Sequence, residues 1–341
     1  MKKFKFLLYP LSILYSIFSS FRNLLFDFGL IDSIKYKIPT IGIGNLSTGG
    51  TGKSILVDYI IERFKTSKKI TTLSRGYNRK TTGFVHASKS SNAYEIGDEP
   101  FQFFSKHPEI NVVVCENRRK GMDIILKNLP TTELCIWDDV FQHRFVKPGL
   151  MILLTTFQYP FYKDEILPVG NLRENKGSSK RADVIVVTKC PIDLKINDKE
   201  SFIESLSPLD NQKVFFSSLT YKEKIKSNLD EIHIDTLSAS DFILVTGIAD
   251  SSYLVEFLNS KKLKFKHLKY SDHFTFTKSS IDKIRRLSVD KKVLTTEKDF
   301  GRLKPKINDR DIYFIEVSMK FNYEINDYNF DETISDYIYN D

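Results

Sequence analysis

A glycine-rich segment between an apolar run and a helical pattern constrains this chain more than any other feature. The segment follows the β-branched run Ile38–Gly44 and precedes residues 55–61, whose apolar residues have helical spacing. Glycines let backbone N–H groups approach phosphate oxygens, the helix N-terminus favours their negative charge, and a lysine reaches the β/γ-phosphates. We therefore expect a nucleotide phosphate site with the Ser54 hydroxyl as a Mg²⁺ ligand. Its residues are Thr48, Gly49, Gly50, Thr51, Gly52, Lys53 and Ser54.

The nucleotide at this loop is expected to be ATP. Ser47 stands where the strict G-x-x-x-x-G-K-[ST] pattern has glycine, so the loop is closer to a G-G-x-G-K-[ST] variant. The tract Thr188-Lys189-Cys190-Pro191 follows a strand-like run as a guanine-specificity motif would, but proline stands where that motif needs aspartate. A purely structural glycine turn is the alternative, and the flanking strand and helix weigh against it.

The rest of the chain alternates short apolar runs with helical stretches, which predicts an α/β fold with mainly parallel sheets. Strands are expected at residues 38–44, 70–73, 112–115, 134–137, 151–154, 184–187, 214–216, 242–246, 293–296 and 312–317. A length of 341 residues fits one large or two ordinary domains. We expect a membrane-associated helix at residues 1–32, a P-loop kinase-type domain at 33–217 and a second, smaller α/β domain at 218–341. The polar residues 218–240 are the expected joint.

The formal net charge of +8 is concentrated near the N-terminus. Residues 1–80 contain 14 Lys and Arg against 4 Asp and Glu, whereas the remainder contains 37 against 39. Basicity confined to one quarter of the chain argues against a nucleic-acid partner. The cysteines Cys115, Cys135 and Cys190 are scattered without a CxxC pair. They predict reduced core thiols in an intracellular protein and exclude a disulfide scaffold and a cysteine zinc site.

The N-terminal residues are expected to associate with a membrane surface. Lysines at positions 2, 3 and 5 precede an uncharged run from Phe6 to Phe21, and Arg22 and a second apolar patch follow. The run is shorter than the roughly 20 residues that span a bilayer. A helix in the membrane interface, with its basic residues near anionic lipid, fits better. A helix packed on the protein's own core and a cleaved signal peptide are the alternatives.

Two carboxylates follow another candidate strand. Asp138 and Asp139 come directly after the apolar run Leu134–Trp137. Aspartates at the C-terminal end of a buried strand, downstream of a phosphate loop, suit Mg²⁺ binding directly or through water. Such aspartates also serve as caps, and the phosphate loop favours the metal role here.

Other tracts contain candidate groups that also have structural interpretations. Asp98, in Gly97-Asp98-Glu99-Pro100, is a candidate base or metal ligand, or else a helix N-cap. Arg173 and Glu174 end a loop-like tract, where they could meet phosphate and metal or form only a surface ion pair. His273, after Ser271-Asp272, and His143, beside the aspartate pair, are isolated histidines, which are more often structural.

Taken in order, seven tracts resemble the tetraacyldisaccharide 4'-kinase family of lipid A biosynthesis. They are Gly44-Asn45 through Ser54, Ser74-Arg75-Gly76-Tyr77, Gly97–Pro100, Asp138–Arg144, Leu167–Glu174, Asp272-His273 and Thr295-Thr296-Glu297-Lys298-Asp299. The chain departs from the usual family pattern at Val140, Asn171, Phe274 and Ser54, and each departure leaves the proposed chemical groups in place. The resemblance extends from residue 41 to residue 299, and the hydrophobic N-terminus also fits it.

The resemblance implies two α/β domains and an N-terminal helix attached to the cytoplasmic face of the inner membrane, peripherally or as a single helix anchor. It implies transfer of the γ-phosphate of ATP to the 4'-hydroxyl of a tetraacylated glucosamine disaccharide 1-phosphate, giving lipid IVA. A monomer is expected. By position, the resemblance assigns Lys53 and Ser54 to phosphate and Mg²⁺, Asp138, Asp139 and Glu174 to the metal, Arg75, Asn171 and Arg173 to the substrate, and Asp98 with His273 to activation of the sugar hydroxyl.

Phosphoryl transfer mainly requires positioning and charge stabilisation, which Lys53, Mg²⁺ and the loop amides would supply. Asp98 would accept the proton of the sugar hydroxyl, and His273, from the other domain, would orient it or share the proton. This arrangement predicts domain closure before chemistry. Two alternatives remain open. One is a membrane-tethered P-loop ATPase switch, which usually has lysine where Thr48 stands, and the other is a P-loop kinase of a soluble substrate.

Overall fold

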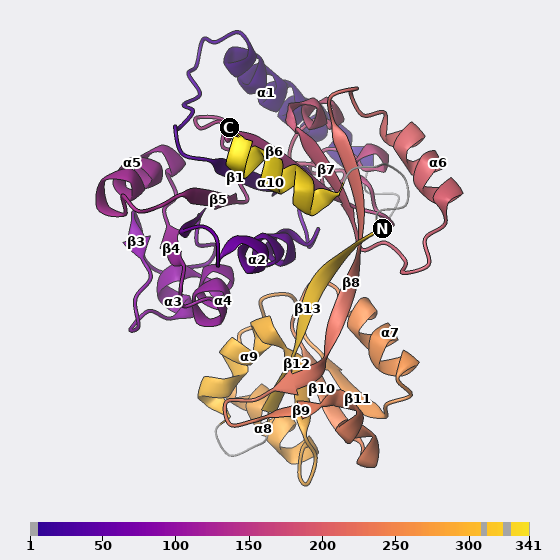
Figure 1. Cartoon of the computed structure of the whole chain (residues 1–341). Helices are drawn as coiled ribbons and strands as arrows, with labels where there is room; N and C mark the ends of the chain where they lie inside the picture. The colour runs from indigo at the N-terminus through magenta and orange to yellow at the C-terminus, as the bar shows by residue number, and fades with distance from the viewer. Residues whose placement is uncertain (1–5, 308–311, 323–328, 341) are drawn as a thin grey trace. The chain divides into compact units, whose positions relative to one another are not determined.

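The structure is a computed structural model that describes residues 6–307, 312–322 and 329–340 (Figure 1). The basic residues Lys2, Lys3 and Lys5 lie outside the described residues. The chain divides into two compact units, Met1–Ser218 with Met319–Asp341, and Leu219–Ser318. Both units are mixed α/β, so the predicted fold class is confirmed.

The sheet of the first unit is almost entirely parallel. Its strands lie in the order β8, β7, β6, β1, β5, β2, β4, β3, and among these only the β3–β4 pair is antiparallel in the described residues. The strands are β1 (Thr40–Asn45), β2 (Ile70–Ser74), β3 (Val85–His86), β4 (Asn111–Val114), β5 (Leu134–Asp138), β6 (Leu150–Thr156), β7 (Val184–Thr188) and β8 (Lys213–Lys226). Ile136 and Trp137 of β5 enter different hydrophobic clusters, so both faces of this strand are covered. Continuous apolar runs predicted all of these strands except the two-residue β3, because such burial leaves no polar face.

The helices of the first unit are α1 (Tyr9–Asp27), α2 (Lys53–Phe64), α3 (Ala93–Ile96), α4 (Asp98–Lys106), α5 (Arg118–Asn128), α6 (Ile196–Leu206) and α10 (Phe330–Asn340). Short 3-10 helices cover Phe161–Lys163 and Lys176–Arg181. Helix α2 packs Leu56 and Ile60 into the same cluster as Ile41 and Ile43 of β1. This packing fixes the strand, loop and helix that the sequence predicted.

The second unit contains a smaller group of parallel strands, which belong to the same 13-stranded sheet. Strand β10 (Phe242–Thr246) lies between β11 (Phe265–Lys269) and β12 (Val293–Thr296), and β12 pairs with β13 (Ile312–Asn322). Strand β9 (Glu231–His233) pairs antiparallel with β8. The helices are α7 (Ser252–Ser260), α8 (Lys278–Leu287) and α9 (Glu297–Leu303), with 3-10 turns at Ile234–Ala239 and Lys304–Lys306. Leu244 and Val245 of β10 enter different clusters, so helices cover both faces.

The C-terminal segment returns to the first unit, whereas the sequence-based division placed all of residues 218–341 in one domain. Strands β8 and β13 each run from one unit to the other. Beyond β13, Phe330 stacks on Phe321 with ring centroids 4.1 Å apart. Phe330, Ile334 and Ile338 of α10 are buried in the core beside β1. This return depends on contacts between residues far apart in sequence, which local patterns do not encode.

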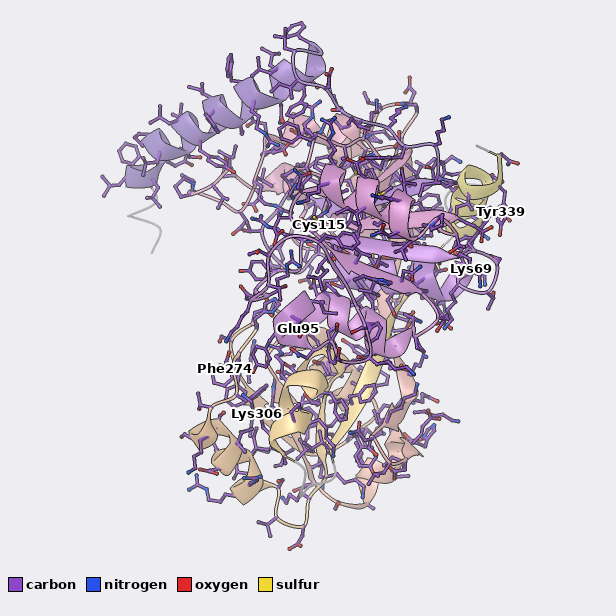
Figure 2. The ribbon with its side chains drawn as sticks, turned by 90° about the vertical axis from the view of Figure 1, so that its left-hand side faces the viewer. Lys69, Glu95, Cys115, Phe274, Lys306 and Tyr339 are labelled. Carbon is purple, nitrogen blue, oxygen red and sulfur yellow. The ribbon has the colours of Figure 1, made fainter. Side chains whose placement is uncertain are left out.

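The cysteines are buried and unpaired, as predicted for core thiols. Cys115 is labelled in Figure 2. Burial raises the pKa values of Cys135 and Cys190 to about 12, so both stay protonated at neutral pH.

Helix α1 has an unusual orientation, because most of its apolar side chains are exposed whereas two of its serines are buried. Leu14, Ile17 and Phe18 are 64%, 61% and 70% exposed, whereas Ser12 and Ser19 are buried. A helix packed on a core through its apolar side would show the reverse pattern. In the described part of the chain, no helix combines the length and hydropathy needed to cross a membrane.

Candidate active site

The loop between β1 and α2 has the backbone shape expected of a phosphate-binding turn. Gly49 and Gly52 have positive φ angles of 129° and 91°, which residues with a Cβ rarely adopt. Gly52 is the N-cap of α2, and no described side chain caps the first amides of this helix. An anion placed there would meet amide N–H groups and the favourable end of the helix dipole.

Asn45, the last residue of β1, holds this loop from inside. Its Nδ2 donates to Thr51 Oγ1 at 2.8 Å and to the Gly49 carbonyl at 3.3 Å. Thr188, at the end of β7, donates its hydroxyl to the Thr51 carbonyl at 2.8 Å. These bonds fix the loop before any nucleotide arrives, which lowers the ordering cost of binding.

Lys53, Asp139 and Arg173 converge beside the loop. Lys53 Nζ lies 3.4 Å from Asp139 Oδ1 and 3.2 Å from Asn45 Oδ1. The Arg173 guanidinium donates to both carboxylate oxygens of Asp139, at 3.0 and 3.2 Å. Burial alone would raise the pKa of Asp139, but Lys53 and Arg173 hold it well below its usual range. The site therefore presents an ionised carboxylate between two cations, and those cations are suited to bind phosphate.

Asp138 points a buried carboxylate into the same region. Its neighbour across the sheet is Ile43 of β1, so the ends of β1 and β5 meet at one edge. The Oδ1 atom has no hydrogen-bond partner among the described residues. Burial and the nearby charge of Glu99 raise the pKa of Asp138 above its usual value.

This buried oxygen fits a Mg²⁺ role. Mg²⁺ is usually bound by one or two carboxylates together with substrate phosphates and water. Within the described ranges, no group of three or more His, Cys, Asp or Glu residues is placed to hold a metal. The residues therefore fit an ion completed by nucleotide phosphates better than a cage made by the protein alone.

Arg118 holds the chain at the ends of β4 and β5 through hydrogen bonds to backbone carbonyls. The sequence did not predict this role. The side chain is buried at the start of α5 and donates to the carbonyls of Cys115 and Asp138, at 2.6 and 3.0 Å. Burial lowers its pKa to about 10. The available signal was its position just after β4, because groups that follow parallel strands gather at one edge. Glu99, whose charge acts on Asp138, was not predicted either, because the pattern Gly97-Asp98-Glu99-Pro100 gives it no role distinct from that of Asp98.

The tracts around Arg75 and Asp98 lie side by side. A Cβ on Gly76 would lie 2.8 Å from the Ile96 carbonyl oxygen, and one on Gly97 would lie 2.9 Å from the Tyr77 carbonyl oxygen. Both glycines have positive φ angles, of 71° and 93°. Asp98 is the first residue of α4, whose N-cap is Gly97. Arg75 is exposed after β2.

The tract Leu167–Glu174 is attached to the phosphate loop. The Asn171 carbonyl accepts from the Thr48 amide at 2.7 Å, and the Arg173 amide donates to the Leu46 carbonyl at 2.8 Å. The Asn171 side chain donates to Asp164 at 3.1 Å. The structure thus brings Thr48, Asn171 and Arg173 together.

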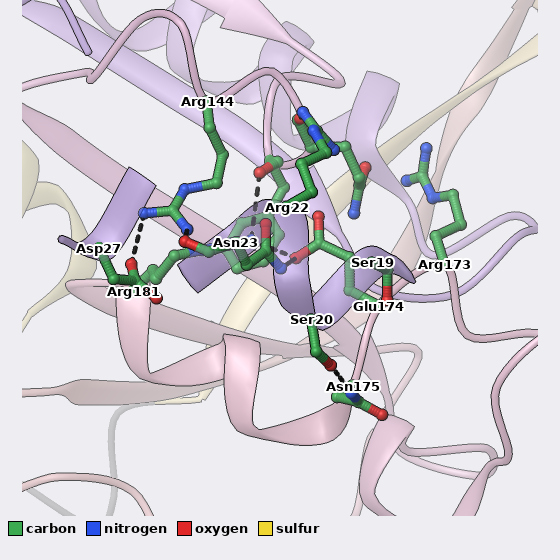
Figure 3. Close-up of polar contacts among 12 residues, drawn as sticks. Ser19, Ser20, Arg22, Asn23, Asp27, Arg144, Arg173, Glu174, Asn175 and Arg181 are labelled. Carbon is green, nitrogen blue, oxygen red and sulfur yellow. Dashed lines mark hydrogen bonds and ion pairs between the residues drawn. The ribbon is translucent and has the colours of Figure 1, made fainter. Parts of the chain in front are cut away.

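Glu174 was predicted to bind Mg²⁺ together with Asp138 and Asp139, but its carboxylate contacts α1. It is 1% exposed, and its Oε2 accepts from Arg181 at 2.7 Å and from Asn23 of α1 at 2.9 Å (Figure 3). The other oxygen, Oε1, has no described hydrogen-bond partner. Arg173 pairs with Asp139 instead, so the surface ion pair considered from the sequence is absent from the described residues.

The two isolated histidines have different surroundings. Burial and the charge of Arg118 lower the pKa of His143 to about 4, so its ring is neutral at pH 7. His273 belongs to the second unit, has a positive φ of 54°, and donates its amide to the Gly247 carbonyl at 3.1 Å. The next residue, Phe274, stacks on Tyr270 at 4.6 Å between ring centroids.

Asp299 gives the last of the seven tracts a structural role. Its fully buried carboxylate accepts from the Gly247 amide at 2.8 Å and from Thr296 Oγ1 at 2.7 Å. Arg302 pairs with the same carboxylate at 2.9 Å. The turn at Gly247, to which His273 is bonded, is therefore fixed from α9.

The fold and this site define an α/β protein of the P-loop kinase type, because the strand, loop and helix, the lysine and the strand-end aspartates occupy one edge of a parallel sheet. A comparison of families identifies it further. The family described as tetraacyldisaccharide-1-P 4'-kinase, LpxK, matches residues 4–338, and the chain belongs to this family. The resemblance of the seven tracts is thereby confirmed.

Individual relatives agree with this assignment. A tetraacyldisaccharide 4'-kinase of Flavobacterium psychrophilum is 40% identical over 333 residues, which cover 97% of this chain and 96% of the relative. That of Bacteroides thetaiotaomicron is 38% identical over 312 residues, covering 87% and 82%. A crystal structure of LpxK from Aquifex aeolicus in complex with ATP superposes with a TM-score of 0.79 at 29% identity and covers 98% of each chain.

Proposed function

We propose that this protein transfers the γ-phosphate of ATP to the 4'-hydroxyl of a tetraacylated glucosamine disaccharide 1-phosphate, giving lipid IVA. The observation that carries the proposal is the convergence of Lys53, Asp139 and Arg173 on the loop after β1. In a P-loop enzyme, such cations stabilise charge on the phosphoryl oxygens during transfer. Membership of a 4'-kinase family supports the acceptor.

ATP is proposed to bind at the turn formed by Thr48 to Ser54. Ser54, Asp138 and Asp139 would hold Mg²⁺, which when bound would neutralise charge on the nucleotide phosphates. Glu174 remains a candidate for the same ion, through its unpartnered Oε1. Lys53 would exchange its contact with Asp139 for phosphate oxygens.

The acceptor hydroxyl is proposed to lose its proton to Asp98. A sugar hydroxyl is a weak nucleophile, so a carboxylate within hydrogen-bond reach lowers the barrier. His273 is proposed to orient Asp98 or to share this proton. Arg75, Asn171 and Arg173 are proposed to contact the phosphorylated disaccharide.

The acyl chains and the membrane are proposed to lie against α1. The outward apolar residues of this helix form a surface that water does not favour. A cavity of about 500 Å³ lies between α1 and residues 165–177. Its apolar lining residues, which include Ile13, Ile17 and Leu172, suit an acyl chain, and its remaining lining includes the polar Ser12, Ser16, Glu165, Asn175 and Lys176. Attachment to the cytoplasmic face of the inner membrane, by a monomer, belongs to this proposal.

Radiolabelled ATP and two acceptors test the proposal. The protein is incubated with the tetraacylated disaccharide 1-phosphate or with its deacylated analogue, and labelled product is measured. Label on the acylated acceptor alone is expected. Equal label on both acceptors would favour a kinase of a soluble substrate, and ATP hydrolysis without transfer would favour a nucleotide-dependent switch.

A further inference from the structure

Helix α1 is attached to the first unit by polar contacts along its inner side. Ser12 Oγ donates to the Ile166 carbonyl at 2.9 Å, Tyr15 Oη to the Arg173 carbonyl at 3.0 Å, and Ser16 Oγ to Asn175 Oδ1 at 3.0 Å. Apolar packing has no directional requirement, whereas each of these bonds fixes a distance and an angle. The helix therefore sets the position of the segment it contacts.

A further contact on this side of α1 involves the buried carboxylate of Glu174. The Glu174 carboxylate is 1% exposed and lies between Asn23 Nδ2 and an Arg181 nitrogen. Hydrogen bonds to ionised groups are stronger than neutral ones, and a buried carboxylate that loses a donor is costly. Figure 3 shows Asn23 and Glu174 pointing toward each other, while the Arg173 side chain points away from them.

The adjacent residues Arg173 and Glu174 therefore bond to different parts of the first unit. Arg173 contacts Asp139 and the carbonyl of Asn45, at the end of β1 before the phosphate loop, the latter at 3.1 Å, and Glu174 contacts α1. A displacement of Glu174 would move the Arg173 backbone, because the two share a peptide bond.

A second connection joins α1 to the loop after β5. Arg144 donates to the Asn23 carbonyl at 2.7 Å, and Arg22 donates to the Gln142 carbonyl at the same distance. Gln142 in turn donates to the Asn45 carbonyl at 3.0 Å. Both loops that reach the phosphate site are therefore bonded to the last two turns of α1.

We propose that Asn23 is a positioning residue for phosphoryl transfer: by holding the Glu174 carboxylate, it fixes the segment from which Arg173 reaches Asp139 and the phosphate loop. Helix α1 is accordingly part of the scaffold of the phosphoryl-transfer site as well as a lipid-facing element. This inference rests on the proposed kinase function, and the outward side of α1 has no part in it.

The test compares Asn23→Ala with Ser19→Ala in the full chain. Ser19 is a matched control, because it is buried on the same helix and its hydroxyl bonds to the Ser16 carbonyl of α1 itself. Turnover of ATP and the acylated disaccharide is measured in mixed micelles. For Asn23→Ala, kcat is expected to fall about 10- to 100-fold, which is the usual effect of removing a residue that orients a metal-binding side chain. KM for the acylated disaccharide and flotation with anionic vesicles are expected to stay unchanged, and Ser19→Ala should match the original protein.

A size-matched variant sharpens the comparison. Asn23→Asp replaces the donor with a second carboxylate facing Glu174 and should lower kcat more than Asn23→Ala does. A kcat for Asn23→Ala equal to that of the original protein would overturn the proposal. So would a loss of kcat matched by an equal loss of vesicle binding, since Asn23 would then act only through the helix's attachment to lipid.

Hydrogen exchange separates this inference from the function on which it rests. Amides of residues 165–175 should exchange faster in Asn23→Ala and at the original rate in Ser19→Ala. Unchanged exchange in Asn23→Ala would overturn the inference even in an active kinase. Failure of the original protein to phosphorylate the acylated disaccharide would instead overturn the proposed function, and the exchange comparison would still be readable.

Discussion

Asp139 shows how a single residue combines backbone and electrostatic constraints. It has a positive φ of 49°, which a non-glycine residue adopts at a cost, and aspartate is among the residues that tolerate it best. Its carboxylate is held by Lys53 and Arg173. The sequence predicted Asp139 and Lys53 from their positions after two strands. The partnership with Arg173 was unpredictable, because it depends on how the tract Leu167–Glu174 lies against the phosphate loop.

Replacing Asp98 should affect the chemical step more than nucleotide binding. Asp98→Ala and the size-matched Asp98→Asn are expected to lower kcat by about 10²- to 10⁴-fold, the usual contribution of a general base. ATP affinity, measured by calorimetry, should stay close to that of the original protein. Unchanged turnover in either variant would remove Asp98 from the mechanism.

Asp58 should make stability depend on pH. Its carboxylate lies 2.7 Å from His107 Nε2 and 2.7 Å from Lys106 Nζ. Burial alone would raise its pKa, but these two partners lower it below the ordinary value of 3.8. A carboxyl whose pKa is lower in the folded state contributes stability above the unfolded pKa and loses it as pH falls through the folded pKa. Asp58→Asn should therefore be less stable by about 1–3 kcal/mol at pH 7.

The difference between the original protein and Asp58→Asn should shrink below about pH 4. Urea unfolding at pH 7 and at acid pH measures it. The exposed Asp198→Asn serves as the control and should show a small effect at both values. A difference that stays constant from pH 7 to acid pH would contradict the assignment.

At the scale of elements, local patterns predicted most strands and missed those whose pairing is set from elsewhere. Strand β1, the loop and α2 were predicted because apolar runs, glycines and helical spacing are all local. Strand β11 was absent from the predicted strands because Phe265–Lys269 contains two lysines and a histidine beside only two apolar residues. Strand β8 was predicted too short because the polar residues 218–226 indicated a joint between domains. Strand β13 was predicted to end at residue 317, whereas it continues to Asn322. The contacts of Ser12 and Ser16 in α1 could not be predicted, because their partners lie about 150 positions away.

The outward side of α1 gives a direct test of lipid contact. Phe18 is 70% exposed on this helix, and Leu229 is 90% exposed in the second unit. Removing a phenylalanine that inserts into lipid costs about 1.5–3 kcal/mol. Phe18→Ser should therefore reduce flotation with anionic vesicles by about tenfold or more, and Leu229→Ser should leave it unchanged. Equal binding of both variants would place the lipid surface elsewhere.

At the scale of the whole molecule, the chain leaves the first unit along β8 and returns along β13, and α10 then completes the first core. The sequence indicated two α/β domains and a joint near residue 218. The return of the chain to the first unit was not predicted, because the contacts of Phe321 and Phe330 with the first core join residues far apart in sequence. The two groups proposed to activate the sugar hydroxyl belong to different units, Asp98 to the first and His273 to the second.

The C-terminal helix α10 should contribute to the free energy of unfolding of the first unit. Phe330 is fully buried and contacts Phe215 and Phe321. Phe330→Ala should lower the free energy of unfolding by about 3–5 kcal/mol, as measured in urea. Tyr339→Ala, on the exposed side of the same helix, should have a much smaller effect. Equal stability of the two variants would mean that α10 is not part of this core.

The position of the transferred phosphate tests the central claim most directly. The protein and its Lys53→Ala variant are each incubated with ATP, Mg²⁺ and the tetraacylated disaccharide 1-phosphate, and the lipid product is analysed by phosphorus NMR and mass spectrometry. The account predicts one new phosphomonoester at the 4'-position with the original protein and almost none with Lys53→Ala. Phosphate at another position, or full transfer by Lys53→Ala, would contradict it.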